Sequence, residues 1–286
     1  MYSATSSGQT TGSVVSEGNE TLQTLSGLIQ KKKVLAGCGL ASGNVWCSQI
    51  IARSGFDWVL IDMEHAPICP EKATAITQAV VAASAGQCIP IIRTPSHGVE
   101  WVKWALDCGA AGIIVPMINN GVEAERVVQH ALYPPHGQRS FGPFLAPFAD
   151  TDRSSDVAKY LTKRVPQLAI ILMIESAEGV RHAEEILSVK GVTGCFIGSF
   201  DLRQSLGLQG GDGEEPVFVE ALEKVLSIGR RHNLAVGTVA MSEAAAKRKT
   251  EMGFSFLLSG TDMFFLAAGA ERNLDQCVRG VRSAEV

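Results

Sequence analysis

The sequence predicts a single (β/α)8 TIM barrel, and three observations lead to that fold class. The chain has 286 residues, which suits one large α/β barrel better than two ordinary domains. Short apolar runs alternate with longer segments of helical period, as in βα units around a parallel sheet. Eight such runs can be counted, which is the number that closes a barrel, so an open doubly wound sheet is the less favoured alternative.

The eight apolar runs are mostly continuous rather than alternating, as expected of strands that are covered on both faces. The predicted strands are residues 34–39, 58–63, 89–93, 112–117, 169–175, 194–199, 235–240 and 254–259. Helices are predicted between them over residues 71–85, 99–108, 122–132, 177–188, 216–232 and 242–252. The connection over residues 133–167 is much longer than the others. It is either a loop that covers the site or an insertion with a short helix near residues 154–163.

Composition and charge exclude several classes of protein. Hydrophobic residues make up 46% of the chain, so a large core can be buried. The net charge of −4 argues against a nucleic-acid surface, and no apolar stretch is long enough to predict a membrane span. Residues 1–20 are rich in Ser, Thr and Gly and are expected to form a flexible tail, which leaves residues 21–286 for the barrel. Seven scattered cysteines without a C-x-x-C pair favour reduced thiols and a cytoplasmic protein.

Charged residues follow four of the predicted strands, at the end of the barrel where active sites lie. Asp62 lies at the end of the second strand and His65 follows it, Arg93 ends the third, Glu175 ends the fifth and Asp201 follows the sixth. An ionised group after an apolar strand is costly unless a partner lies near it. We therefore expect these side chains to converge at the mouth of the barrel.

Glu175 and Asp201 fit a site for a hard cation. Two carboxylates from neighbouring strands can hold Mg²⁺ or Mn²⁺, with Co²⁺ as a third candidate, and leave room for water and a bidentate 2-oxo acid. The cation would act as a Lewis acid and stabilise an enolate. The alternative is that each carboxylate merely caps the helix that follows it.

Arg93 and His65 are candidates for the chemistry itself. Arg93 could donate two hydrogen bonds to the oxo acid or the enolate oxygen, or else form a salt bridge at the barrel rim. A histidine suits acid–base work near neutral pH, and the alternative is a loop histidine that is only hydrogen-bonded. The lysines between Lys72 and Lys249 fall in predicted helices or before strands, which disfavours a Schiff-base aldolase.

The motifs around these residues resemble those of the HpcH/HpaI aldolases, which are metal-dependent class II enzymes that use pyruvate. The segment GFDWVLIDMEHAP, residues 55–67, is similar to the hallmark of that family. Further blocks agree in order, with x for a position that is not compared: IIR at 91–93, LDCGA at 106–110, VPM at 115–117, YPPxGxR at 133–139, IE at 174–175 and IGxxDL at 197–202. The likeness runs from residue 34 to residue 270, nearly the whole predicted barrel.

The resemblance implies a role for each site residue. His65 would be the acid–base residue, made more basic by Asp107, and Arg93 would steady the enolate and the aldol transition state. Glu175 and Asp201 would bind the divalent metal.

The resemblance also implies a pocket, substrates and an assembly. Asp62 would shape the pocket, and the backbone near Phe200 would touch pyruvate. The substrates would be a 2-oxo acid, pyruvate or oxaloacetate, and an aldehyde. The family's barrels form homo-oligomers, hexamers or trimers of dimers, that exchange the C-terminal helix, which here would be residues 263–281. The apolar start of that segment needs a partner surface.

Three positions depart from the family pattern. Met173 stands where the family commonly has a glutamine that contacts pyruvate or bound water. Ser140 replaces a glycine, and Ser199-Phe200 replaces the usual Pro-Ala, which brings bulk close to the pyruvate pocket. These changes predict an altered substrate or binding mode.

The predicted function is metal-dependent cleavage or formation of a 4-hydroxy-2-oxo acid through a pyruvate enolate. One alternative is an oxo-acid decarboxylase that forms a carbon–carbon bond, as in macrophomate synthase, which resembles this family. The other is a non-catalytic barrel that serves as a binding or assembly subunit.

Overall fold

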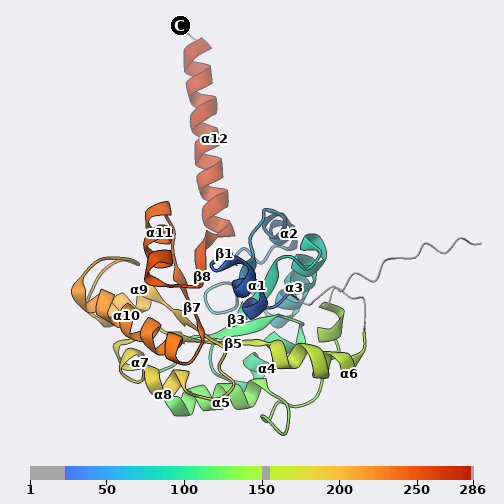
Figure 1. The fold of residues 1–286 in the computed structure, drawn as a ribbon. Helices are drawn as coiled ribbons and strands as arrows, with labels where there is room; N and C mark the ends of the chain where they lie inside the picture. Colours follow the sequence, from blue (N-terminus) through green and yellow to red (C-terminus); the bar gives the residue numbers. More distant parts are fainter. Residues whose placement is uncertain (1–22, 150–154, 285–286) are drawn as a thin grey trace, which may run out of the picture.

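The computed structural model describes residues 23–149 and 155–284, in which eight parallel strands close into a barrel (Figure 1). Each strand pairs with its neighbour in sequence, and β8 returns to pair with β1. The strands are β1 (Leu35–Leu40), β2 (Trp58–Asp62), β3 (Ile89–Arg93), β4 (Gly112–Val115), β5 (Ala169–Ile174), β6 (Gly194–Ile197), β7 (Ala235–Val239) and β8 (Phe256–Thr261). The predicted fold class is confirmed. The predicted tail, residues 1–20, lies outside the described residues.

Helices surround the strands and alternate with them along the chain. They are α1 (Leu25–Lys32), α2 (Val45–Arg53), α3 (Pro70–Ser84), α4 (Val99–Asp107), α5 (Gly121–Ala131), α7 (Ala177–Arg181), α8 (Ala183–Leu187), α9 (Ser199–Ser205), α10 (Pro216–Arg231), α11 (Glu243–Met252) and α12 (Asp262–Ala284). The helix predicted over residues 177–188 is divided at His182, whose backbone leaves the helical region. The helices predicted from the periodic pattern do not include α1, α2 and α9, which have 8, 9 and 7 residues.

The interior of the barrel is a packed core. Alternate residues of the strands point inward, and the inner cluster includes Trp58 and Phe256, whose rings meet edge to face. Glycine makes room for both rings, because a Cβ at Gly37 would lie 2.1 Å from Trp58 and one at Gly237 would lie 2.4 Å from Phe256. Leu25 and Leu28 of α1 join the same cluster, so α1 closes the N-terminal end of the barrel.

The long connection between α5 and β5 lies at the N-terminal end of the barrel, because α5 ends there and β5 begins there. Its described parts form a 3-10 turn (Ala146–Ala149), the short helix α6 (Val157–Lys159) and a π-helical turn (Tyr160–Arg164). The short helix predicted within this connection is therefore present. The reading of the connection as a cover for its own barrel's mouth is wrong, because the mouth is at the other end.

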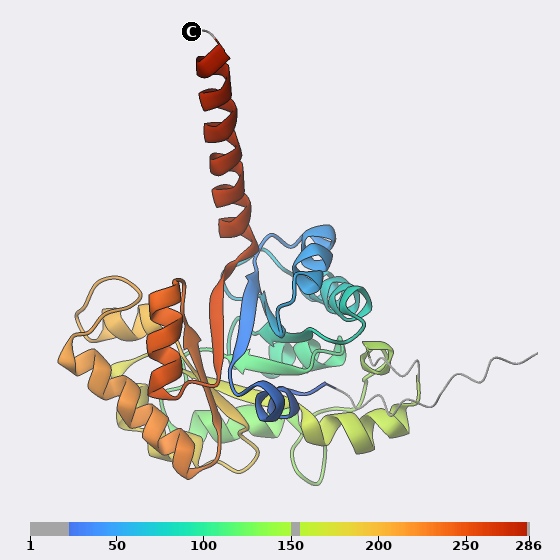
Figure 2. The same cartoon turned by 45° about the horizontal axis from the view of Figure 1, so that its top comes forward.

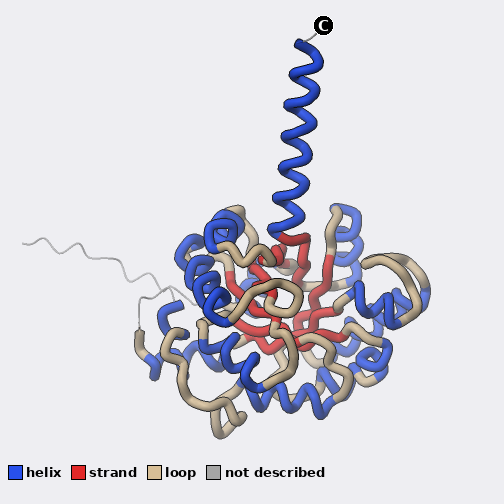
Figure 3. The backbone as a smooth tube through the Cα atoms, turned by 180° about the vertical axis from the view of Figure 1, so that it is seen from behind, coloured by secondary structure: helices blue, strands red, loops and turns tan. Residues whose placement is uncertain are grey.

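The final helix, α12, projects away from the barrel as a single long rod (Figure 2). The view from behind shows the same separation (Figure 3). Of its 23 residues only Asp262, at the start, is buried. The described residues contain no helix with the length and hydropathy needed to span a membrane.

Candidate active site

The two-residue period of the strands places three charged side chains over the barrel interior. Trp58 and Leu60 of β2 point into the barrel, so Asp62, two residues further on, points the same way. Ile89 and Ile91 of β3 also point inward, which gives Arg93 the same orientation. Glu175 follows Met173, another inward residue, just beyond β5. The residues of β2, β3 and β5 that precede these charged groups are buried. Asp62, Arg93 and Glu175 are therefore the first charged side chains along their strands, and they lie at the C-terminal mouth of the barrel.

Asp62 and Arg93 form a bidentate ion pair across neighbouring strands. Arg93 Nε donates to Asp62 Oδ1 at 3.0 Å, and Arg93 Nη2 donates to Oδ2 at 2.6 Å. Burial pushes the pKa of Asp62 upward, but the hydrogen bond and charge of Arg93 outweigh it and hold that pKa below its ordinary value. The fixed pair presents the guanidinium to the mouth of the barrel.

Glu64 is a further carboxylate of this site that the sequence reasoning left without a role. Its Oε2 lies 3.3 Å from Arg93 Nη1 and 3.4 Å from His65 Nε2. Burial raises the pKa of Glu64, and the charges of Asp62 and Asp201 add to that effect. Its position directly before His65, at the end of the second predicted strand, could have identified Glu64 as a site residue from the sequence.

Glu175 is almost completely buried, with 3% of its surface exposed. Its Oε1 accepts a hydrogen bond from the backbone N–H of Met117 at 2.7 Å. Burial, followed by the charges of Glu64 and Asp201, raises the pKa of Glu175 to about 7. A Cβ at Gly198 would come within 2.2 Å of Glu175 Oε2, so glycine is what lets the carboxylate lie against the start of α9.

One pocket brings Arg93 together with the two predicted metal ligands, whereas Asp62 is not among its lining residues. It encloses about 70 Å³ and is lined by Arg93, Glu175 and Asp201, with Met173 and Phe200 among its apolar residues. The remaining lining residues are Leu60, Ile114, Phe196, Gly198, Ser199, Val239 and Leu258. Across the described ranges, no three His, Cys, Asp or Glu side chains are grouped closely enough to hold a metal by themselves. Any cation here would therefore take two protein carboxylates and complete its shell with other oxygen atoms.

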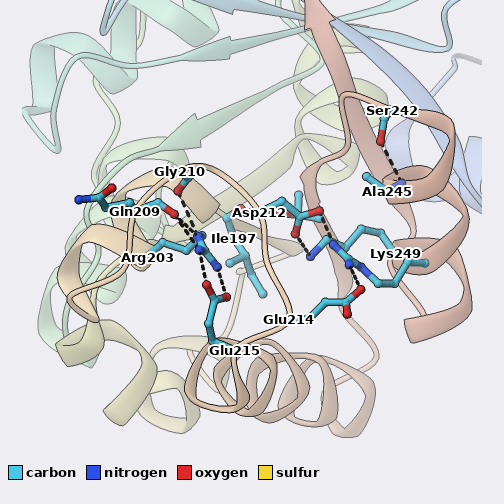
Figure 4. Close-up of polar contacts among 12 residues, drawn as sticks. Ile197, Arg203, Gln209, Gly210, Asp212, Glu214, Glu215, Ser242, Ala245 and Lys249 are labelled. Carbon is cyan, nitrogen blue, oxygen red and sulfur yellow. Dashed lines mark hydrogen bonds and ion pairs between the residues drawn. The ribbon is translucent and has the colours of Figure 1, made fainter.

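Polar contacts of Arg203 hold the loop after α9 in place (Figure 4). Arg203 of α9 donates to the carbonyl oxygens of Gln209 and Gly210 at 2.7–3.1 Å, and it pairs with Glu215 at 2.6 Å. The clamp holds Gly211 against Phe200, since a Cβ at Gly211 would lie 2.2 Å from the ring.

A second set of ion pairs ties the same loop to α11. Arg248 pairs with Asp212 and with Glu214, and Lys249 Nζ lies 3.0 Å from Asp212 Oδ1 (Figure 4). Lys249 is buried against the rings of Phe218 and Phe254, and burial lowers its pKa. The loop is thus fixed from two helices at once.

His65 and Asp107 lie at different ends of the barrel within one chain. His65 is exposed on the loop after β2, at the mouth, next to Glu64. Asp107 is the last residue of α4, at the N-terminal end, where its Oδ1 lies 2.5 Å from Nη2 of the buried Arg139. Burial raises the pKa of Asp107 despite the charge of Arg139. The structure does not bring Asp107 to His65 within a single chain.

Comparisons with known proteins find relatives over most of the chain. A family model described as HpcH/HpaI aldolase/citrate lyase matches residues 36–268. The chain is 33% identical to a hydroxypyruvate/pyruvate aldolase from Chromohalobacter salexigens, over 82% of this chain and 89% of the relative. It is 34% identical to a 4-hydroxy-2-oxo-heptane-1,7-dioate aldolase from Escherichia coli, over 82% and 87%. The crystal structure of macrophomate synthase superposes with a TM-score of 0.80 at 25% identity, covering 91% of this chain and 89% of that one.

Proposed function

Because the chain belongs to the HpcH/HpaI aldolase/citrate lyase family, we propose that it is a divalent-metal-dependent lyase that breaks or forms a carbon–carbon bond beside a 2-oxo acid. The observation that carries the proposal is the meeting of Glu175, Asp201 and Arg93 in one small pocket. The substrate would be a 4-hydroxy-2-oxo acid, cleaved to pyruvate and an aldehyde.

The charges of the pocket fit a divalent cation. Burial, followed by the negative charges of Glu64 and Asp201, raises the pKa of Glu175, and the nearby guanidinium of Arg93 is already paired with Asp62. A dication held by the Glu175 and Asp201 carboxylates would relieve this repulsion, and Mg²⁺, Mn²⁺ or Co²⁺ prefers such ligands. When bound, it would supply Lewis-acid stabilisation of negative charge on the 2-oxo group.

The side chains would divide the work as follows. His65 would accept the proton of the substrate's 4-hydroxyl group as the bond between C3 and C4 breaks and the aldehyde forms. The electron pair of that bond would pass to C3 and the keto oxygen, giving the enolate of pyruvate. Arg93, held rigid by Asp62, would donate hydrogen bonds to the developing oxyanion. Transfer of that proton from His65 to C3, directly or through water, would then release pyruvate.

Asp107 enters the proposal only through a second chain. Within one chain it lies at the far end of the barrel from His65. Its side chain still keeps 20% of its surface exposed, while Arg139 beside it is fully buried. We propose that Asp107 of a neighbouring subunit supports His65 in a homo-oligomer, which would reconcile the role that family resemblance implies with its position.

The pocket's apolar floor also favours a second candidate function. Met173, rather than an amide side chain, lies beneath Gly198, and Phe200 adds bulk at the mouth. An apolar environment assists loss of CO₂ from an oxo diacid, because it disfavours the charged carboxylate. Decarboxylation of oxaloacetate much faster than any aldol cleavage would favour this candidate over the aldolase.

The test is metal-dependent enolisation of pyruvate. The protein is incubated with pyruvate in D₂O, and methyl exchange is followed by NMR with Mg²⁺, Mn²⁺ or Co²⁺ and then with a chelator. We expect exchange that the chelator abolishes and that Glu175→Gln removes. Glu178→Gln, the same change at an exposed position on α7, should leave exchange unaltered. Absence of exchange with every divalent ion would reject the proposal.

A further inference from the structure

The hydroxyl group of Ser199 is buried in the wall of the pocket without a hydrogen-bond partner. Ser199 is the first residue of α9, it keeps 1% of its surface exposed, and it lines the pocket together with Glu175 and Asp201. Its Oγ is among the buried polar atoms that no described group satisfies. A buried hydroxyl left unpaired destabilises the folded state, so such a group calls for a partner outside the described chain.

The other polar side chains of the pocket offer no donor to the carboxylate of an incoming 2-oxo acid. Glu175 and Asp201 are acceptors, and they repel a carboxylate. Arg93 directs Nε and Nη2 to Asp62 and has Nη1 3.3 Å from Glu64, and the proposed function assigns its remaining hydrogen-bonding capacity to the keto oxygen. Among the described residues that line the pocket, Ser199 is thus the neutral side chain with a proton left to donate. The remaining lining side chains are apolar.

We propose that Ser199 is a substrate-binding residue whose hydroxyl donates a hydrogen bond to the carboxylate of the 2-oxo acid. This inference rests on the proposed function. The pocket needs such a donor because Met173, whose methyl group packs under Gly198, offers none. The Met173 side chain gives the substrate no hydrogen bond from the floor of the pocket, and the Ser199 hydroxyl would give one from the adjoining wall.

A purely structural role would look different. A serine that stabilises the fold donates to a backbone carbonyl, as buried Thr238 does to Ile197 at 2.9 Å. Ser199 makes no such bond. Thr94, after β3, has a buried unpaired hydroxyl too, but it does not line the pocket. It therefore provides a matched control for the loss of an unpaired buried hydroxyl.

The test compares Ser199→Ala with Thr94→Val in the full chain. Binding of oxalate, an unreactive 2-oxo acid analogue, is measured by calorimetry with Mn²⁺ present, and KM and kcat for pyruvate are measured beside it. Loss of a hydrogen bond to a charged group should weaken oxalate binding and raise KM about tenfold or more in Ser199→Ala. Thr94→Val should leave both values unchanged. Ser199→Pro, which suits the first position of a helix, keeps the test valid if the alanine variant is unstable.

The outcomes separate this inference from the proposed function. Failure of the unaltered protein to bind oxalate with any divalent ion would reject the proposed function itself. Normal binding by the unaltered protein, with equal affinity in Ser199→Ala and Ser199→Pro, would overturn the role of Ser199 alone. A fall in kcat at constant KM and constant oxalate affinity would overturn it as well.

Discussion

The aromatic ring of Phe200 lies directly against Gly211, with no space between them for a methyl group. Phe200 is half exposed at the mouth of the pocket, and Gly211 belongs to the loop that Arg203 and Lys249 hold in place. The clamped loop therefore sets the direction of a side chain that forms one wall of the site.

We predict that Phe200→Ala widens the choice of 2-oxo acid. The ratio of kcat/KM for 2-oxobutanoate over pyruvate should rise about tenfold, the scale on which a pocket discriminates one methylene group. Gly211→Ala should shift the ratio in the same direction by displacing the ring. In the Phe200→Ala background, Gly211→Ala should have no further effect, because the ring on which it acts is gone. Independent effects of the two changes would contradict the proposed link.

Glu175 should destabilise the metal-free protein above neutral pH. Its pKa rises from an ordinary 4.5 to about 7 through burial, so the folded state holds the proton longer than the unfolded state does. The resulting stability is fully present below pH 4.5 and is lost as the pH rises through 7. Glu175→Gln keeps the shape without the charge, so it should stabilise the metal-free protein at pH 8 by roughly 2 kcal/mol.

Urea unfolding in chelator at pH 5 and pH 8 measures this effect. The difference between the variant and the unaltered protein should be small at pH 5 and large at pH 8. Added Mn²⁺ should stabilise the unaltered protein but not Glu175→Gln. Glu178→Gln serves as the control. A Glu175→Gln variant that is less stable than the unaltered protein at pH 8 would refute the prediction.

The barrel was predictable because its signal is local. Continuous apolar strands and the alternation of side chains are written in neighbouring residues, and the same alternation places Asp62, Arg93 and Glu175 at one mouth. Contacts between distant loops leave no such trace. Gly211 packs on Phe200, and the Ser199 hydroxyl is unpaired, because of the position that α9 and the loop after it take in the folded chain. The spacing of residues in the sequence does not specify that position.

Asp107 shows a different limit. The resemblance assigns it to His65, but a motif carries no information about which end of the barrel, or which chain, a residue serves. Its position at the end of α4 follows from the connectivity of a βα unit, in which the helix runs back from the mouth. The motif and the connectivity together therefore predict that Asp107 lies far from His65 of the same chain.

The exposed apolar stripe of α12 should hold the proposed homo-oligomer together. Leu274, Val278 and Val281 recur at intervals of three and four residues and are 64%, 37% and 53% exposed. A single helix with such a stripe is unstable in water unless another surface covers it. Leu274→Glu should therefore shift the protein toward monomers in sedimentation velocity. Gln276→Glu adds a charge on another side of the helix and should leave the assembly intact; equal behaviour of the two variants would contradict the prediction.

Mixed oligomers should reveal whether Asp107 supports His65 of a neighbouring chain. His65→Ala and Asp107→Asn should each lose most of their activity, and the asparagine keeps an acceptor for the buried Arg139. If the two residues act across a two-fold interface, unfolding and refolding the variants together should restore activity. Half of the random dimers then combine both variants, and each contains one intact His65–Asp107 site, so about a quarter of full activity is expected.

If the two residues act within one chain, every site in the mixture carries one defect and activity stays at the level of the separate variants. Refolding each variant alone is the control, and a mixture no more active than these would rule out the arrangement.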